Sequence, residues 1–264
     1  MGRVSIVPEG IEPRRVNAIS VVPKSNRGLR LCLDARLINA CMPRWPLCYP
    51  TADDMVAEAA KLGGVHRGVW YTFDIADAFS TISIDDRSRK ALGAVHWPGV
   101  GHLLYEKAPF GLASSSALLA ITLSFSVELA LDAVQARFGA VACDVYCDDG
   151  SLFVPDPLFQ AHGQAVWELF SDTMRDLGWR FSESKTSGTP SRVFEQRGLA
   201  FDFSSSPGFI SLKVDKRREY GGEFLGLAKR GRNGEHVSYR ELRSLPGKAR
   251  LLSGACMINP TGAE

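Results

Sequence analysis

The segment VACDVYCDDGSLFV, residues 141–154, has apolar runs on both sides of Cys147-Asp148-Asp149-Gly150. An Asp-Gly dipeptide between apolar runs is the strongest short-range signal for a β-hairpin. We therefore predict two antiparallel strands with Asp148 and Asp149 at the tip that joins them. Because such dipeptides usually mark only a solvated turn, a chemical role for this pair needs support from elsewhere in the chain.

A third aspartate gives that support. Asp74 follows Val69–Phe73, a short run of β-branched and aromatic residues that predicts a strand ending beside the hairpin. Clustered carboxylates repel one another unless a cation compensates them, and hard oxygen ligands of this kind suit Mg²⁺. Two such ions about 3.5–4 Å apart can activate an attacking hydroxyl and stabilise a leaving pyrophosphate. The three aspartates are therefore candidate ligands for metal-dependent phosphoryl transfer.

The other patterns mix helices with hairpins. Helices are predicted over Thr51–Leu62, Ala113–Phe138 (one long buried helix, with or without an interruption) and Phe159–Leu177. Further hairpins are predicted over Asn17–Asp34, turning at Ser25-Asn26, and over Gly198–Leu212, turning at Pro207-Gly208. Strands and helices mixed in this way, with antiparallel hairpins, indicate an α+β fold and not a doubly wound parallel sheet.

Composition limits the function classes. The 264 residues are 45% hydrophobic and 23% charged, which is typical of a globular protein with a substantial core. The net charge is only +2, so local basic segments would have to hold any nucleic acid. The six cysteines form no Cys-x-x-Cys pair, and no targeting signal is recognisable. We expect reduced thiols and an intracellular location, cytoplasmic or nuclear.

One stretch is long enough by count to cross a bilayer. Ala108–Val127 carries no charge over 20 residues. It contains Pro109, Gly111 and three consecutive serines, and Glu128 follows it at helical spacing. We therefore expect a buried helix and no membrane partner.

Four blocks stand in a fixed order along the chain. They are Arg30–Asn39 (RLCLDARLIN), Phe73–Phe79 (FDIADAF), Pro109–Ser115 (PFGLASS) and Tyr146–Asp149 (YCDD). In this order and spacing they resemble the fingers segment, aspartate block, Pro-Phe-Gly-Leu block and Tyr-x-Asp-Asp motif of reverse transcriptases, especially those of LTR and DIRS-like retrotransposons and retroviruses. The resemblance runs from about Ile19 to at least Leu212.

The resemblance implies the right-hand polymerase fold of fingers, palm and thumb. Its expected parts are fingers over 1–50, palm over 51–83, fingers again over 84–106, palm with the primer-grip hairpin over 107–212, and a truncated start of the thumb or connection over 213–264. Within the last part, 238–252 looks like the helical segment after the palm in DIRS-like elements, with basic residues that could face a duplex backbone. Amphipathic packing explains that segment nearly as well.

The resemblance also assigns the chemistry. Asp74 and Asp148 would bind two Mg²⁺ ions, with Mn²⁺ as a possible substitute, Asp149 would assist, and Ile75 beside Asp74 is counted among the metal-site residues. Lys185 falls where the family has a lysine proposed to protonate pyrophosphate as a general acid.

Several residues would contact the incoming nucleotide. Phe79 aligns with the aromatic that excludes a ribose 2′ hydroxyl, although most phenylalanines belong simply to the core. Lys24 and Arg30 could clamp the β and γ phosphates, although a lone cation on a hairpin is ordinarily a solvated charge. The remaining nucleotide contacts are Asp77, Ala78, Phe110 and Gly111, of which Gly111 would let the base and templating strand approach closely and could also only start the helix.

The favoured hypothesis is a polymerase that adds dNTPs to a primer on an RNA or DNA template, within a polyprotein whose further domains, such as ribonuclease H, lie outside this chain. Gln196-Arg197-Gly198-Leu199 departs from the family's Phe-Leu-Gly at the primer grip. The alternative is a truncated or domesticated fragment that binds nucleic acid without polymerising. An RNA-templated RNA polymerase is a third reading, which Phe79 disfavours.

Overall fold

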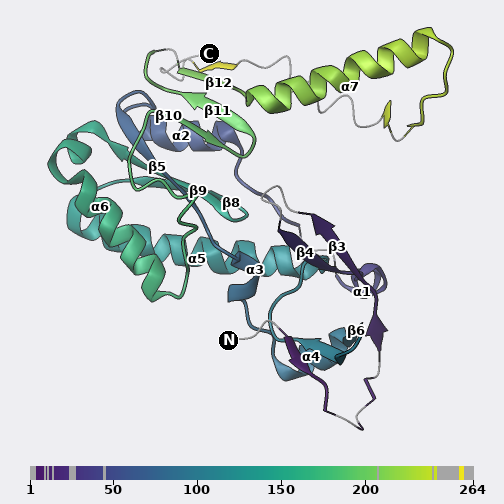
Figure 1. Cartoon of the computed structure of the whole chain (residues 1–264). Helices are drawn as coiled ribbons and strands as arrows, with labels where there is room; N and C mark the ends of the chain where they lie inside the picture. The colour runs from purple at the N-terminus through teal and green to yellow at the C-terminus, as the bar shows by residue number, and fades with distance from the viewer. Residues whose placement is uncertain are drawn as a thin grey trace.

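The centre of the molecule is a three-stranded antiparallel sheet (Figure 1). Its strands are, in spatial order, β5 (Gly68–Asp74), β9 (Asp149–Pro155) and β8 (Ala142–Tyr146). The computed structural model describes residues 4–8, 10, 12–13, 15–23, 28–43, 46–206, 208–239, 241–242 and 256–258. The predicted strand before Asp74 and the predicted hairpin of residues 141–154 are thus both confirmed, and they lie side by side.

Two long helices, α5 (Ala113–Phe138) and α6 (Asp156–Asp176), cover one face of this sheet. Successive strand side chains point to opposite faces, so Tyr71 and Phe73 pack toward these helices. Tyr71 stacks on Trp167 of α6 with ring centroids 5.1 Å apart. Both faces of β5 are buried, which explains why its sequence is almost continuously apolar.

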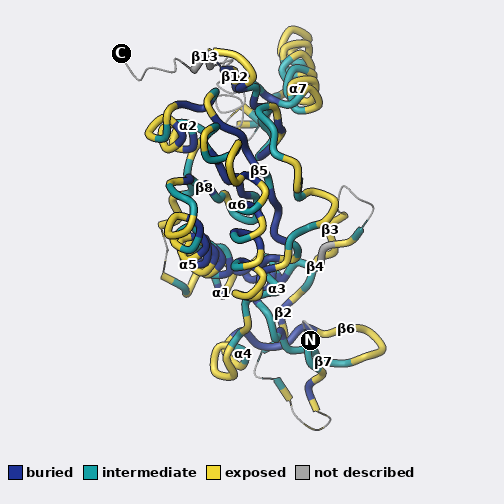
Figure 2. The backbone as a smooth tube through the Cα atoms, turned by 90° about the vertical axis from the view of Figure 1, so that its left-hand side faces the viewer, coloured by how far each residue is buried: buried dark blue, intermediate teal, exposed yellow. Residues whose placement is uncertain are grey.

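The opposite face is covered by α2 (Ala52–Lys61) and by an antiparallel sheet. The strands of that sheet are β10 (Val193–Gln196), β11 (Leu199–Asp202), β12 (Gly208–Leu212) and β13 (Cys256–Ile258). Trp70 and Phe153 of the central sheet meet Phe194, Phe201 and Phe203 here in an aromatic cluster. The central sheet is therefore sandwiched, and burial is greatest around it (Figure 2).

Predicted boundaries agree with the structure at several points. Thr51 caps α2 through a reciprocal pair of hydrogen bonds with Asp54. The predicted hairpin of residues 198–212 exists as β11 and β12, with Gly208 already in β12, and Pro207 lies outside the described residues. The α+β class is confirmed.

The N-terminal part forms a separate group of elements around its own apolar cluster. These are β1 (Val4–Ile6), β2 (Val16–Asn17), β3 (Ile19–Pro23), β4 (Leu29–Leu33), α1 (Arg36–Cys41), α4 (Asp86–Leu92), β6 (Ala94–Trp97) and β7 (Gly101–Tyr105). The short helix α3 (Ala78–Thr81) follows β5 and packs on the core of the central sheet. Strands β3 and β4 pair antiparallel as predicted, and the turn between them, 24–27, lies outside the described residues.

Helix α5 corrects one expectation. It is a single helix without interruption, but only one face is buried. Its outer face exposes an apolar stripe at a spacing of three to four residues: Leu118, Ile121, Phe125 and Leu129. By length and composition alone this helix could cross a membrane, yet its inner face is packed in the core against the central sheet.

Helix α7 (Val214–Arg232) was not predicted. The segment contains four glycines, which lower helix propensity by about 1 kcal/mol each relative to alanine and weaken the sequence pattern. The helix extends away from the rest of the molecule (Figure 1) and buries none of its residues. Of the predicted helical segment 238–252, most residues lie outside the described part of the chain.

Candidate active site

The tip of the central hairpin is tighter than predicted. Tyr146 pairs with Asp149, so the turn consists of Cys147 and Asp148, while Asp149 and Gly150 already belong to β9. Cys147 has a φ of 60°, a left-handed conformation in the turn. Glycine is needed at position 150 for close packing and not for the turn, because a Cβ there would lie 2.1 Å from the ring of Phe73.

The pairing of β5 with β9 gathers the three predicted aspartates. Asp74 and Asp149 are direct cross-strand partners. The backbone N–H of Ile75 donates to the carbonyl of Asp148 at 2.8 Å. Asp74 is only 5% exposed. Residues 74 positions apart in the sequence are thus held together by main-chain contacts.

A loop after α6 brings Lys185 to the same place. The N–H of Ser182 donates to the carbonyl of Asp74 at 2.8 Å, and the N–H of Asp74 donates to the hydroxyl of Thr186 at 3.2 Å. Lys185 Nζ lies 2.6 Å from Asp74 Oδ2. Sequence reasoning found Lys185 but missed Thr186, whose only signal was its position next to that lysine.

The carboxylates perturb one another. Burial, followed by the charges of Asp148 and Asp74, raises the pKa of Asp149 to about 6. The hydrogen bond to Asp74 is the main cause that raises the pKa of Lys185 above its ordinary value, so this lysine keeps its charge at neutral pH. The site therefore holds excess negative charge that one ammonium group only partly balances.

The donor set fits a divalent cation in its chemistry. Carboxylate oxygens are the ligands that Mg²⁺ prefers, and the ammonium of Lys185 already places positive charge against Asp74. Among the described residues, however, no group of three or more His, Cys, Asp or Glu side chains is gathered as a ready-made metal site. Asp74, Asp148 and Asp149 could hold the ion only if their side chains turn toward it.

The raised pKa of Asp149 predicts a pH-dependent stability in metal-free buffer. Because the pKa of Asp149 is higher in the folded protein than in the unfolded chain, protonation of this group stabilises the folded state. The stabilisation is complete below pH 3.8 and is lost as the pH rises through about 6. Asp149→Asn stays neutral, so we expect it to be more stable than wild type by roughly 1–3 kcal/mol at pH 7.5 and equal to it near pH 3.5.

Thermal unfolding at the two pH values, with chelator present, measures this difference. Asp172→Asn, at an exposed position on α6, is the matched control and should show no comparable change between them. A stability gain by Asp149→Asn that is the same at both pH values would contradict the assignment.

Three of the predicted nucleotide residues, Asp77, Ala78 and Phe79, follow Asp74 closely in the chain. Phe79 on α3 packs edge-on against Phe110, with ring centroids 4.7 Å apart. Ala78 is buried, and Asp77, with a φ of 51°, precedes the helix. Of the two predicted phosphate clamps, Lys24 lies outside the described residues, and for Arg30 only the backbone in β4 is described.

The sequence predicted that Gly111 lets the nucleotide base and the templating strand approach its backbone closely. A Cβ at this position would lie 2.1 Å from the carbonyl oxygen of Leu33, and its φ is +101°. Asn39 of α1 also binds this segment. Its amide donates to the carbonyl of Gly111 at 2.9 Å, and its Oδ1 accepts from the N–H of Ala113 at 2.9 Å. The close approach shown is therefore to β4 of the chain itself.

We expect Gly111→Ala to destabilise the protein by at least about 2 kcal/mol, because backbone strain adds to a clash with main-chain atoms. Gly139→Ala separates the two effects, since Gly139 also has a positive φ, +118°, but open space around it. Urea unfolding of both variants measures the costs, and equal costs would show that the contact with Leu33 contributes nothing.

Comparison with known proteins bears on the fold. No protein-family model matches this chain, and no curated protein matches its sequence. Solved structures of foamy virus protease-reverse transcriptase are similar to it. One, a dRH form in complex with double-stranded DNA, has a TM-score of 0.60 at 15% identity over 94% of this chain and 37% of that chain.

Two further foamy virus structures agree. A complex with an RNA/DNA hybrid has a TM-score of 0.55 at 17% identity over 88% of this chain and 27% of that one. The CSH mutant of the prototype foamy virus protein has a TM-score of 0.52 at 22% identity over 74% of this chain and 23% of that one. The chain thus covers at most 37% of the length of these proteins. Its fold is similar to that of the part it covers.

Proposed function

We propose that this chain is the catalytic core of an RNA-directed DNA polymerase, which adds dNTPs to a primer 3′ end. The observation that carries the proposal is the meeting of Asp74, Asp149 and the Asp148 tip, with Lys185 bound to Asp74. Four sequence blocks that resemble reverse transcriptases support it, two of which contain the three aspartates, and the fold is similar to foamy virus protease-reverse transcriptase structures. We assign the chain to the LTR or DIRS-like group on the sequence blocks alone.

Magnesium, bound by Asp74, Asp148 and Asp149, would supply Lewis-acid activation of the primer hydroxyl and stabilise the leaving pyrophosphate. The protein's own contribution is to place the groups. Lys185 carries a proton beside the carboxylates, where it can pass it to the leaving group. Phe79, packed on Phe110, limits the space for the sugar.

The partners of the proposed enzyme are a primed RNA or DNA template and dNTPs. The foamy virus proteins similar to this chain were solved with double-stranded DNA and with an RNA/DNA hybrid. By the same likeness, the segments 1–50 and 84–106 are proposed as fingers, 51–83 and 107–212 as palm, and 213–264 as the start of the thumb or connection.

A folded fragment that binds nucleic acid without polymerising is the second candidate. It is favoured by the absence, among the described residues, of a ready-made three-ligand metal site.

Primer extension on poly-rA with oligo-dT, dTTP and Mg²⁺ separates the two candidates. The proposal expects extension by the wild-type chain and none by Asp148→Asn. No extension by wild-type protein that is folded and binds the duplex would favour the fragment.

A further inference from the structure

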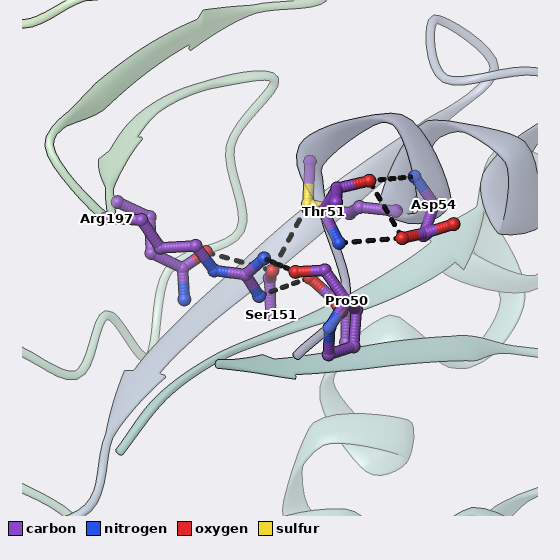
Figure 3. Close-up of polar contacts among 8 residues, drawn as sticks. Pro50, Thr51, Asp54, Ser151 and Arg197 are labelled. Atoms are coloured by element: carbon purple, nitrogen blue, oxygen red, sulfur yellow. Dashed lines mark hydrogen bonds and ion pairs between the residues drawn. The ribbon is translucent and has the colours of Figure 1, made fainter. Parts of the chain in front are cut away.

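A buried polar network lies beneath the catalytic hairpin, between the central sheet and the β10–β11 turn (Figure 3). Asp144 of β8 and Ser151 of β9 are buried, as are Gln196 at the end of β10 and the side chain of Arg197 in the turn that follows. Ser151 Oγ donates to Gln196 Oε1 at 2.9 Å. The end of β10 and the turn after it thus contact the hairpin through polar groups, next to the apolar cluster that Phe153 shares with Phe194 and Phe201.

Arg197 is the centre of this network. It forms an ion pair with Asp144 in which both side chains are less than 10% exposed. Its Nη1 donates to the carbonyl of Pro50 at 3.2 Å. Its guanidinium also lies 5.2 Å from the ring centroid of Tyr146, in cation–π contact. One side chain therefore joins the turn, the segment before α2 and the hairpin.

Tyr146 connects the network to the aspartates. It pairs with Asp149 and precedes the turn residues Cys147 and Asp148. Tyr49 packs against the Tyr146 ring with centroids 4.8 Å apart. The Tyr49 hydroxyl donates a hydrogen bond to Cys147 Sγ at 3.9 Å. Arg197 and Tyr49 together fix the ring next to the tip.

Stability alone does not account for such a network. Replacing a buried ion pair by apolar side chains is often neutral or stabilising, because desolvation offsets the attraction. Within the described chain, Arg197 Nε and Gln196 Nε2 are buried without a hydrogen-bond partner, which adds to the cost. Arg197 also has a left-handed backbone, with a φ of 54°. A costly arrangement next to a catalytic tip is explained better by positioning than by stabilisation.

We propose that Arg197 is a positioning residue, which fixes the tip carrying Asp148 and Asp149 through its contacts with Asp144 and Tyr146. The role of the tip in catalysis rests on the proposed function. The rigidity of the tip is a separate claim that does not depend on it. The fixed tip would hold the backbone of Asp148 and Asp149 in one place through each catalytic cycle, from which their side chains turn toward the cation.

The test uses the double variant Arg197→Met with Asp144→Leu, because the single Arg197→Met leaves a buried carboxylate uncompensated and can fail to fold. The matched control is Arg192→Met with Asp156→Leu. Arg192 Nη2 lies 2.7 and 2.8 Å from the two carboxylate oxygens of Asp156. This more exposed pair joins the residue before β10 to the start of α6, at the other end of β9.

Amide hydrogen exchange and steady-state primer extension are measured on both double variants. For Arg197→Met with Asp144→Leu we expect a thermal midpoint near wild type, faster exchange at residues 146–150, and a kcat reduced about 10–100-fold, as for outer partners of metal ligands. KM for dTTP should change little, and the control should leave exchange at 146–150 unchanged.

The proposal would be overturned if amide exchange at residues 146–150 were as slow in Arg197→Met with Asp144→Leu as in the wild-type chain. It would also be overturned if the control accelerated this exchange equally. The two hypotheses fail separately. If the wild-type chain does not extend primers, the proposed polymerase function fails, while exchange at the tip still decides whether Arg197 positions it.

Discussion

Replacing Asp74 by asparagine is expected to reduce primer extension by at least roughly 10²–10³-fold, the cost of removing one preorganised charged or polar group from an active site. Asp74 is the most firmly held of the three aspartates. It ends β5, is 5% exposed, and has its backbone bonded to Ser182 and Thr186. Asparagine keeps the shape but removes the charge that would bind the cation. Asp149→Asn, which removes only the assisting ligand, should retain more activity.

The Asp74 variant should remain folded. Its lost ion pair with Lys185 contributes little, because the lysine side chain is 63% exposed. Asp53→Asn on the exposed first turn of α2 is the control and should extend primers at the wild-type rate. Extension by Asp74→Asn at the wild-type rate, with normal duplex binding, would exclude Asp74 from the metal site and remove the main support for the proposed function.

Phe79→Ala is expected to admit ribonucleotides. The ring stands against Phe110 at 4.7 Å and is partly buried at the edge of the core, only five residues after Asp74. If it forms the wall against the sugar, removing it opens space for a 2′ hydroxyl. The preference for dUTP over UTP should then fall by about 10²-fold, the discrimination that an apolar wall gives against one added hydroxyl.

The ratio of kcat/KM for dUTP and UTP, which differ only in the 2′ hydroxyl, measures this change. Ile82→Ala serves as the control, because Ile82 is a partly buried residue just after the same short helix and packs on the same core. It should lower stability without altering the ratio. An unchanged ratio in Phe79→Ala would mean that this phenylalanine is core only.

Much of the fold could be predicted because the signals are local. The apolar runs around Asp148-Asp149, the strand ending at Asp74 and the Thr51 cap depend on neighbours in sequence, and all three are present in the structure. Helix α7 was missed because its glycines weaken the local pattern. The exposed stripe on α5 was missed because a uniformly apolar helix does not reveal which face lacks a partner.

The candidate site divides in the same way. The sequence by itself predicted the residues that we propose to carry the chemistry: the three aspartates, Lys185 and Phe79. Only the tertiary structure decided that Asp74 faces Asp149 across two strands, that Gly111 lies against Leu33, and that Arg197 pairs with Asp144. The reason is physical: strand register and buried ion pairs join residues far apart in the chain, and no local pattern records the partner.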